Sequence, residues 1–133
     1  MKTDKILLLS AAVLSGSAVA IGAFAAHGLK PILSAQALQW MQTGVQYQLH
    51  HSIAILVLAF ALKLWPAWGL LAKAAYSFIM GSLLFSGSLY FMALTGSKAL
   101  VLLTPLGGLS FIIGWGLLAL AVWQREQNIG SKK

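Results

Sequence analysis

The sequence predicts an all-α integral membrane protein, a four-helix bundle that forms a single membrane domain over residues 1–133. The first observation is composition: 59% of the residues are hydrophobic and only 8% are charged, whereas a soluble domain has about 25% charged residues. A chain this short cannot hide so much apolar surface from water. The second is length, because four apolar segments reach the roughly 20 residues that cross a bilayer. These spans are 6–26, 47–65, 72–95 and 100–124.

The basic residues predict the orientation of the chain. The net charge is +7, but these residues flank the apolar spans and form no patch with interleaved aromatic residues, which excludes nucleic-acid binding. With four spans, one side of the membrane collects Lys2, Lys5, Lys63, Lys73, Arg125, Lys132 and Lys133. The other side collects Lys30 and Lys98. Because positive residues favour the cytoplasmic side, both termini are predicted to be cytoplasmic.

The first span has an alternative interpretation as a secretory signal peptide. Lys2 and Lys5 precede it, and Ala18-Val19-Ala20 has the form of a cleavage site. The apolar run continues to Ala26, however, which is the length of a membrane span rather than of a signal-peptide core. We therefore expect the segment to remain as span one.

The long link between spans one and two carries a polar stripe. Pro31 can begin a helix. Polar residues then recur at spacings of three or four, at Gln36, Gln39, Thr43, Gln46 and His50. This pattern predicts a short amphipathic helix that lies on the outer surface and leads into span two, with Gly44 as a point where it could break.

Glycine and proline mark the link between spans three and four. Gly96 is placed to close span three. Thr104-Pro105 has the pattern of an N-cap followed by proline in the first helical position. Span four therefore begins at Pro105 after a short interfacial piece, or it runs from about residue 99 and kinks at the proline. We favour the break.

Small residues at helical spacing predict how the spans pack. Burial alone does not bring helices together in lipid, whereas close backbone approach does. The predicted packing positions are Ala11, Ser15, Ala18 and Gly22 in span one, Gly81 and Ser88 in span three, and Gly107 and Gly114 in span four. Span two is richer in large apolar residues, so it is expected to face lipid most.

The histidines are the strongest candidates for chemistry. His27 ends span one, and His50 and His51 open span two. We expect His27 to continue the stripe of Gly16, Ala20 and Ala23 and to point into the bundle. The candidate polar site at the outer face consists of His27, Gln46, Tyr47, His50 and His51. Two interpretations stay open, a haem, metal, quinone or proton-relay site, or interfacial imidazoles bonded to loop groups and water, which we favour.

The remaining side chains argue against enzymes and transporters. Cysteine is absent, and the two carboxylates, Asp4 and Glu126, both lie outside the spans. General acid–base catalysis by paired carboxylates and proton-coupled transport therefore lack their usual residues. Ser86 and Ser88 do not form a G-x-S-x-G motif. We expect no catalytic residue, no metal ligand set and no cofactor.

Four stretches of the sequence resemble a known family. They are residues 22–30, 43–51 and 81–90, and the pattern Thr104-Pro105-Leu106-Gly107-Gly108 followed by Gly114-Trp115. In order and spacing they resemble the small four-helix inner-membrane proteins of the YgdD/YwdK family, which have distant relatives in eukaryotes. The resemblance implies a multi-pass protein of the bacterial inner membrane and leaves activity open. Family-like positions include His27, Gln46, Tyr47 and His51.

Three functional hypotheses follow. The first is a non-enzymatic membrane protein that binds a partner or supports an assembly, its partners being the lipid bilayer and either other membrane proteins or further copies of itself. The second is binding of a small molecule, haem or metal at the outer face through His27, His50 or His51. The third, a membrane enzyme, is disfavoured.

Overall fold

The computed structural model describes residues 2–130, with side chains from 2 to 126, and its regular structure is helical throughout. The elements are α1 (Thr3–His27), α2 (Ala35–Leu64), α3 (Gly69–Gly81), the π-helical turn η1 (Ser82–Ser86), α4 (Gly87–Thr95) and α5 (Leu103–Gly130). Helix α3, η1 and α4 form one continuous segment, Gly69–Thr95. Within the described residues, four segments are therefore long and apolar enough to cross a membrane, which confirms the predicted number of spans.

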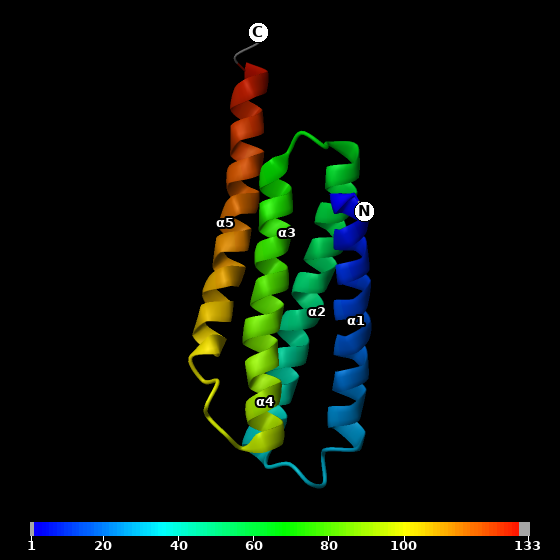
Figure 1. The fold of residues 1–133 in the computed structure, drawn as a ribbon, viewed down its shortest axis with the longest axis vertical. Helices are drawn as coiled ribbons and strands as arrows, with labels where there is room; N and C mark the ends of the chain where they lie inside the picture. Colours follow the sequence, from blue (N-terminus) through cyan, green and yellow to red (C-terminus); the bar gives the residue numbers. More distant parts are fainter. Residues whose placement is uncertain (1, 131–133) are drawn as a thin grey trace.

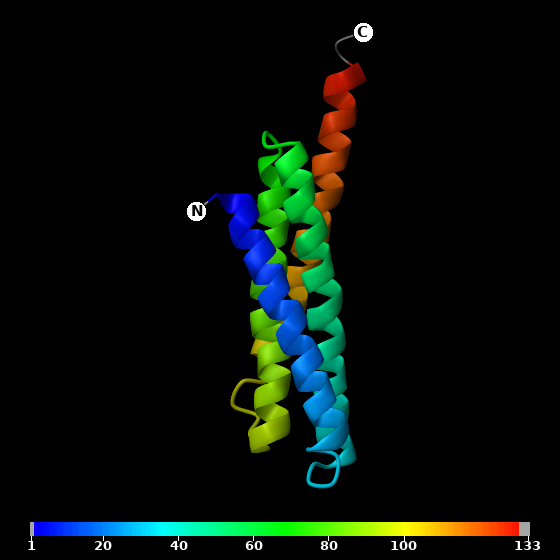
Figure 2. The same cartoon turned by 90° about the vertical axis from the view of Figure 1, so that its right-hand side faces the viewer.

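The four spans form two pairs around a shared centre. Helix α2 packs against α3, η1 and α4, and these elements make up the middle of the bundle. Helix α1 lies on one flank and contacts chiefly α2, whereas α5 lies on the other and contacts chiefly α3 and η1 (Figure 1). The view in Figure 2, turned by a quarter, shows α1 crossing α2 at an angle.

The expectation that span two faces lipid most is wrong. In the most apolar part of each span, the buried share of residues is 39% for α2 and 44% for Gly69–Thr95, but 17% for α1 and 22% for α5. Helix α2 is central because it carries Gln48, His51 and Ser52, all buried. Polar groups in hydrocarbon need partners, so they face other helices and not lipid.

The predicted separate surface helix between spans one and two is also wrong. Its residues form the first turns of α2, a single helix that begins after Ser34, whose Oγ accepts the Ala37 N–H at 3.1 Å. Gly44 does not break this helix, because it lies against the ring of Tyr90 and its carbonyl accepts a hydrogen bond from Ser86. At 1.5 Å per residue the helix measures about 45 Å, which exceeds the roughly 30 Å hydrocarbon thickness. The glutamine-rich start is therefore a direct extension of the spanning helix and not a separate helix.

The predicted break before span four is confirmed, with one correction. Gly96 ends α4 in the left-handed conformation, with a φ of 69°. Helix α5 begins at Leu103, so Pro105 lies in its first turn, where its missing N–H costs nothing. Thr104 is not the N-cap. It is already helical, and its hydroxyl shares a 2.7 Å hydrogen bond with Ser88 on α4.

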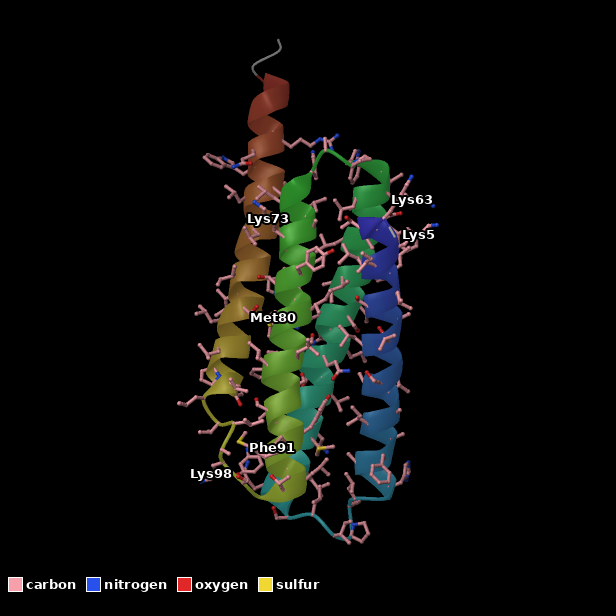
Figure 3. All side chains as sticks on the ribbon, in the orientation of Figure 1. Lys5, Lys63, Lys73, Met80, Phe91 and Lys98 are labelled. Carbon is pink, nitrogen blue, oxygen red and sulfur yellow. The ribbon has the colours of Figure 1, made fainter. Side chains whose placement is uncertain are left out.

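The described ends of the chain lie at the same end of the bundle, which we call the terminal end (Figure 1). Lys5, Lys63 and Lys73 lie near the terminal end and Lys98 lies near the opposite end (Figure 3). Lys132 and Lys133, which contribute to the predicted charge asymmetry, lie outside the described residues. The cytoplasmic location of the terminal end stays a prediction.

Candidate functional site

The three histidines do not form one cluster. His27 and His50 are exposed, whereas His51 is buried. The expectation that His27 points into the bundle is wrong, since Gly16, Ala20 and Ala23 on the same stripe are exposed as well. Helix α1 packs against α2 through its other small-residue face, which includes Gly22. His27 follows Gly22 by five residues, roughly 140° around the helix, so it lies on a different side of α1.

His51 is held by hydrogen bonds at both ring nitrogens. Its Nδ1 lies 2.7 Å from the carbonyl oxygen of Tyr47, and its Nε2 lies 3.1 Å from Nε1 of Trp115. A carbonyl only accepts and an indole N–H only donates. His51 therefore donates from Nδ1, accepts at Nε2 and is neutral. With both nitrogens occupied, it is a structural link between α2 and α5 and has no free position for a metal or haem iron.

Aromatic side chains surround His51 and line a groove. The Phe111 ring is stacked on the imidazole with centroids 3.6 Å apart, and Phe78 lies at 5.2 Å. Between α2, η1 and α5, the Phe111 ring borders an open groove of about 480 Å³, which we call the aromatic groove. Its lining is Tyr47, His51, Phe85, Pro105, Gly108, Leu109, Phe111, Ile112 and Trp115. Of the five residues in the predicted polar site, only Tyr47 and His51 line this groove.

The most connected polar residue is Gln48, which the sequence analysis missed. It is 5% exposed, and its Nε2 donates to the Leu14 carbonyl at 2.9 Å and to Ser17 Oγ at 2.8 Å. Its Oε1 accepts the Tyr90 hydroxyl at 2.9 Å. Gln48 thereby joins α1, α2 and α4. The neighbouring Gln46, which the sequence analysis selected, is exposed.

A helical register would have identified Gln48. Ser52 and Ile55 follow it at spacings of four and three, and all three are buried. Ser52 accepts a hydrogen bond from Ser15 on α1 at 2.8 Å and donates to the Leu49 carbonyl. The face of α2 toward α1 therefore carries a row of polar side chains, Gln48 and Ser52. These side chains form hydrogen bonds with α1 inside the bundle.

The π-helical turn η1 lies in the middle of the third span. Such turns recur at functional sites because they shift the helical register and free backbone groups. Here Ser86 donates to the Gly44 carbonyl at 2.6 Å. Ser82, 2% exposed, carries the single buried side-chain polar atom without a partner among the described residues.

The predicted packing positions lie at two different contacts. On α1, Ala11 and Ala18 are buried and Gly22 lies against Val45 of α2, with 3.2 Å between the Val45 methyl carbon and the position a Cβ would take. On the other flank, Gly81 lies against Phe111 and Gly114 against Phe78. Gly107 lies against the backbone of Phe85, so no side chain fits there.

The described residues contain no group of three His, Cys, Asp or Glu side chains that could hold a metal ion. The polar side chains instead connect helices: Gln48 and Ser52 toward α1, Ser86 and Tyr90 toward α2, and His51 toward Trp115. In hydrocarbon, such hydrogen bonds between helices stabilise the association of spans.

Comparison with known proteins places the chain in a family. Residues 21–108 match the family described as "Protein of unknown function (DUF423)". A "UPF0382 membrane protein" of Haemophilus influenzae is 48% identical over 101 residues, which cover 76% of this chain and 80% of that protein. The "UPF0382 inner membrane protein YgdD" of Escherichia coli K12 is 40% identical over 120 residues, covering 87% and 88%.

A relative from Bacillus subtilis is also similar. The "UPF0382 membrane protein YwdK" of Bacillus subtilis 168 is 38% identical over 117 residues, covering 88% of this chain and 95% of that protein. No solved structure matches the chain. The matches agree with the four apolar spans and with the resemblance drawn from the sequence motifs. The chain belongs to the DUF423 family of UPF0382 membrane proteins, and it is a multi-pass protein of the bacterial inner membrane.

Proposed function

We propose that this protein is a non-enzymatic membrane component that binds the transmembrane helix of a partner through an exposed face of α1. The observation that carries the proposal is a second small-residue face on that helix. It consists of Ala12, Gly16, Ala20 and Ala23, all exposed, and we call it the free face of α1.

The two small-residue faces of α1 have different surroundings. Ala11 and Ala18 are buried, and Gly22 contacts Val45 of α2. On the free face, the spacings of four, four and three residues follow the same helical stripe. A Cβ built on Gly16 would meet no atom within 4 Å. One face of α1 is thus used within the bundle, and the other, also made of small residues, is exposed.

Lipid chains give small residues no particular advantage, because large side chains fill a lipid-facing surface equally well. Between helices, small residues let backbones approach closely and gain van der Waals contact. The free face therefore fits a second helix better than it fits lipid. The buried polar side chains also support a binding role. Their hydrogen bonds hold the helices of the bundle together, so the surface is where we expect a partner to bind.

The test compares two glycines with equally open surroundings. Gly16 lies on the free face, and Gly116 lies on an exposed part of α5 with no atom within 4 Å of its Cβ position. Gly16→Leu should reduce the size of the complex extracted in mild detergent, and Gly116→Leu should not. Equal complex sizes for both variants and the unaltered protein would contradict the proposal.

The same comparison identifies the kind of partner. The chain has no cysteine, so Ala20→Cys introduces a single thiol. If the partner is a second copy, oxidation of native membranes should give a disulfide-linked dimer through this position. If the partner is another protein, the Gly16-dependent complex should contain a second polypeptide and no such dimer.

A second candidate function is the binding of a lipid-soluble compound with a flat ring in the aromatic groove. The groove, about 480 Å³, opens beside α5 and has Tyr47, Phe85 and Trp115 among its lining residues. Its volume is in the range of small-molecule sites, roughly 300 to 1,000 Å³. In this candidate function, the ligand would be held by stacking on aromatic side chains and not, as in the hypothesis from the sequence, by coordination to histidine.

Filling the groove tests this second function. Ile112 lines the groove, whereas its exposed neighbour Ile113 does not. Solvent extracts of the purified protein should contain a ring-bearing compound detectable by mass spectrometry, retained in Ile113→Trp and lost in Ile112→Trp. Extracts with lipid alone would contradict binding in the groove.

The orientation of the chain across the membrane is a further proposal, because a partner helix must pack against α1 in that orientation. We infer that the terminal end faces the cytoplasm, on the basis of the seven-to-two distribution of Lys and Arg. A fluorescent protein fused after Lys133 should be fluorescent, and alkaline phosphatase at the same position should be inactive. Active phosphatase would reverse the orientation.

A further inference from the structure

A groove at the terminal end combines charged and apolar walls. It lies where the first turn of α1 meets the end of α2, has a volume of about 740 Å³, and we call it the basic groove. Its lining is Lys2, Thr3, Asp4, Lys5, Leu8, Leu62, Lys63 and Pro66. None of these residues takes part in the contacts described for the aromatic groove or for the free face of α1.

The charge of the basic groove is positive. Three lysines and one aspartate line it. Lys5 and Lys63 come from different helices, and both lie near the terminal end (Figure 3). Lys2 precedes α1, and no side chain caps the first turn of that helix. The exposed N–H groups of the turn and the positive end of the helix dipole add to the attraction for an anion.

The apolar wall lies deeper than the lysines. Leu62 is 7% exposed, and Leu8 packs against the main hydrophobic core. Leu8 lies three residues further from the chain end than Lys5, and Leu62 lies one residue further from the link than Lys63. The groove therefore offers cations at the level of the membrane surface and apolar side chains toward the hydrocarbon.

We propose that the basic groove binds an anionic phospholipid, with its phosphate held between Lys2, Lys5 and Lys63 and the start of an acyl chain against Leu8 and Leu62. A free phosphate ion would use the lysines and leave the apolar wall in contact with water. Lysines near a membrane surface attract anionic lipids by about a fivefold gain in affinity each. Because the groove brings together lysines from the start of α1 and the end of α2, it would bind a single anionic lipid in preference to the neutral lipids around it.

The experiment measures lipid binding by the full-length protein in detergent, with dioleoyl phosphatidylglycerol as the probe. Its thermal unfolding is followed with phosphatidylglycerol, with dioleoyl phosphatidylcholine and with inorganic phosphate. The test variant is Lys5→Gln with Lys63→Gln. The matched control is Lys73→Gln, because Lys73 lies near the same end and does not line the groove.

We expect phosphatidylglycerol to raise the Tm more than phosphatidylcholine or inorganic phosphate. The double variant should require at least about tenfold more phosphatidylglycerol for the same rise, and Lys73→Gln should behave like the unaltered protein. An equal loss in Lys73→Gln would show general surface attraction and overturn the site. An equal effect of inorganic phosphate would overturn the lipid as its ligand.

Discussion

The two flanks of the bundle differ in how closely the helix backbones approach each other. Helix α1 is joined to α2 through hydrogen bonds, from Ser15 to Ser52 and from Gln48 to Ser17 and the Leu14 carbonyl. Helix α5 is joined to the third span through close glycine contacts at Gly81, Gly107 and Gly114. It also makes hydrogen bonds of its own, from Thr104 and Ser110 to the third span and from Trp115 to His51. A membrane protein has no hydrophobic driving force between its spans. Both flanks combine the two interactions that remain, hydrogen bonding and close packing. The buried Gln48 is the most connected polar residue on the α1 flank, and Gly107 makes the closest backbone contact on the α5 flank.

The glycine flank should be the more sensitive to added volume. Gly107→Ala places a Cβ against the backbone of Phe85, which has no flexible side-chain end to yield. We expect a loss of about 3 kcal/mol in the free energy of unfolding, or a failure to assemble. Unfolding in mixed micelles by increasing SDS measures the change. Gly116→Ala, with open space around it, serves as the control, and equal effects of the two changes would contradict the assignment of close packing.

The hydrogen-bonded flank should be the more sensitive to loss of polar groups. Gln48→Leu keeps the volume and leaves the hydroxyls of Ser17 and Tyr90 without this partner. We expect a loss of about 1 to 2 kcal/mol in the same unfolding assay.

The exposed Gln46 supplies the control for this prediction, since Gln46→Leu should change stability little. A double-mutant cycle with Tyr90→Phe should show coupling between positions 48 and 90, because both changes remove the same bond. Strict additivity of the two changes would contradict the network.

The smallest effect is expected inside η1. Ser82 has a buried hydroxyl with no partner, so Ser82→Ala removes a polar group that makes no hydrogen bond. Because burying such a group is costly, the variant should be as stable as the unaltered protein or more stable by about 1 kcal/mol. Ser86→Ala, which loses the bond to Gly44, should be less stable. A clear loss in Ser82→Ala would indicate a water or ligand bound at its hydroxyl.

The spans could be predicted from the sequence, and the rotation of each helix about its axis could be predicted only in part. The length of an apolar run sets a span, so the predicted 72–95 closely matches Gly69–Thr95. Helix α1 carries small residues on two faces, and the sequence analysis directed both into the bundle. Ala11, Ala18 and Gly22 meet α2, whereas Gly16, Ala20 and Ala23 are exposed. The expected inward direction of His27 was wrong for this reason, although Ala11 and Ala18 are buried.

The candidate site was predicted only in part, because a polar stripe on the extension of a spanning helix resembles a polar stripe on a separate surface helix. Gln46 and His50 belong to that stripe and are exposed, whereas the buried partners are Gln48, His51 and Ser52 on another side of the same helix. The π-helical turn left no pattern in the sequence. Trp115 was identified as part of a family motif, but its bond to His51 depends on the packing of α5.

Photo-crosslinking in native membranes tests the proposed role of the free face of α1 most directly. A benzophenone amino acid replaces Ala20 on the free face or Gly116 on α5, both exposed positions. We predict that illumination yields a discrete protein adduct from position 20, lost when Gly16→Leu is added, and only lipid adducts from position 116. Lipid adducts alone from both positions would show that α1 faces the bilayer, and would contradict the proposal.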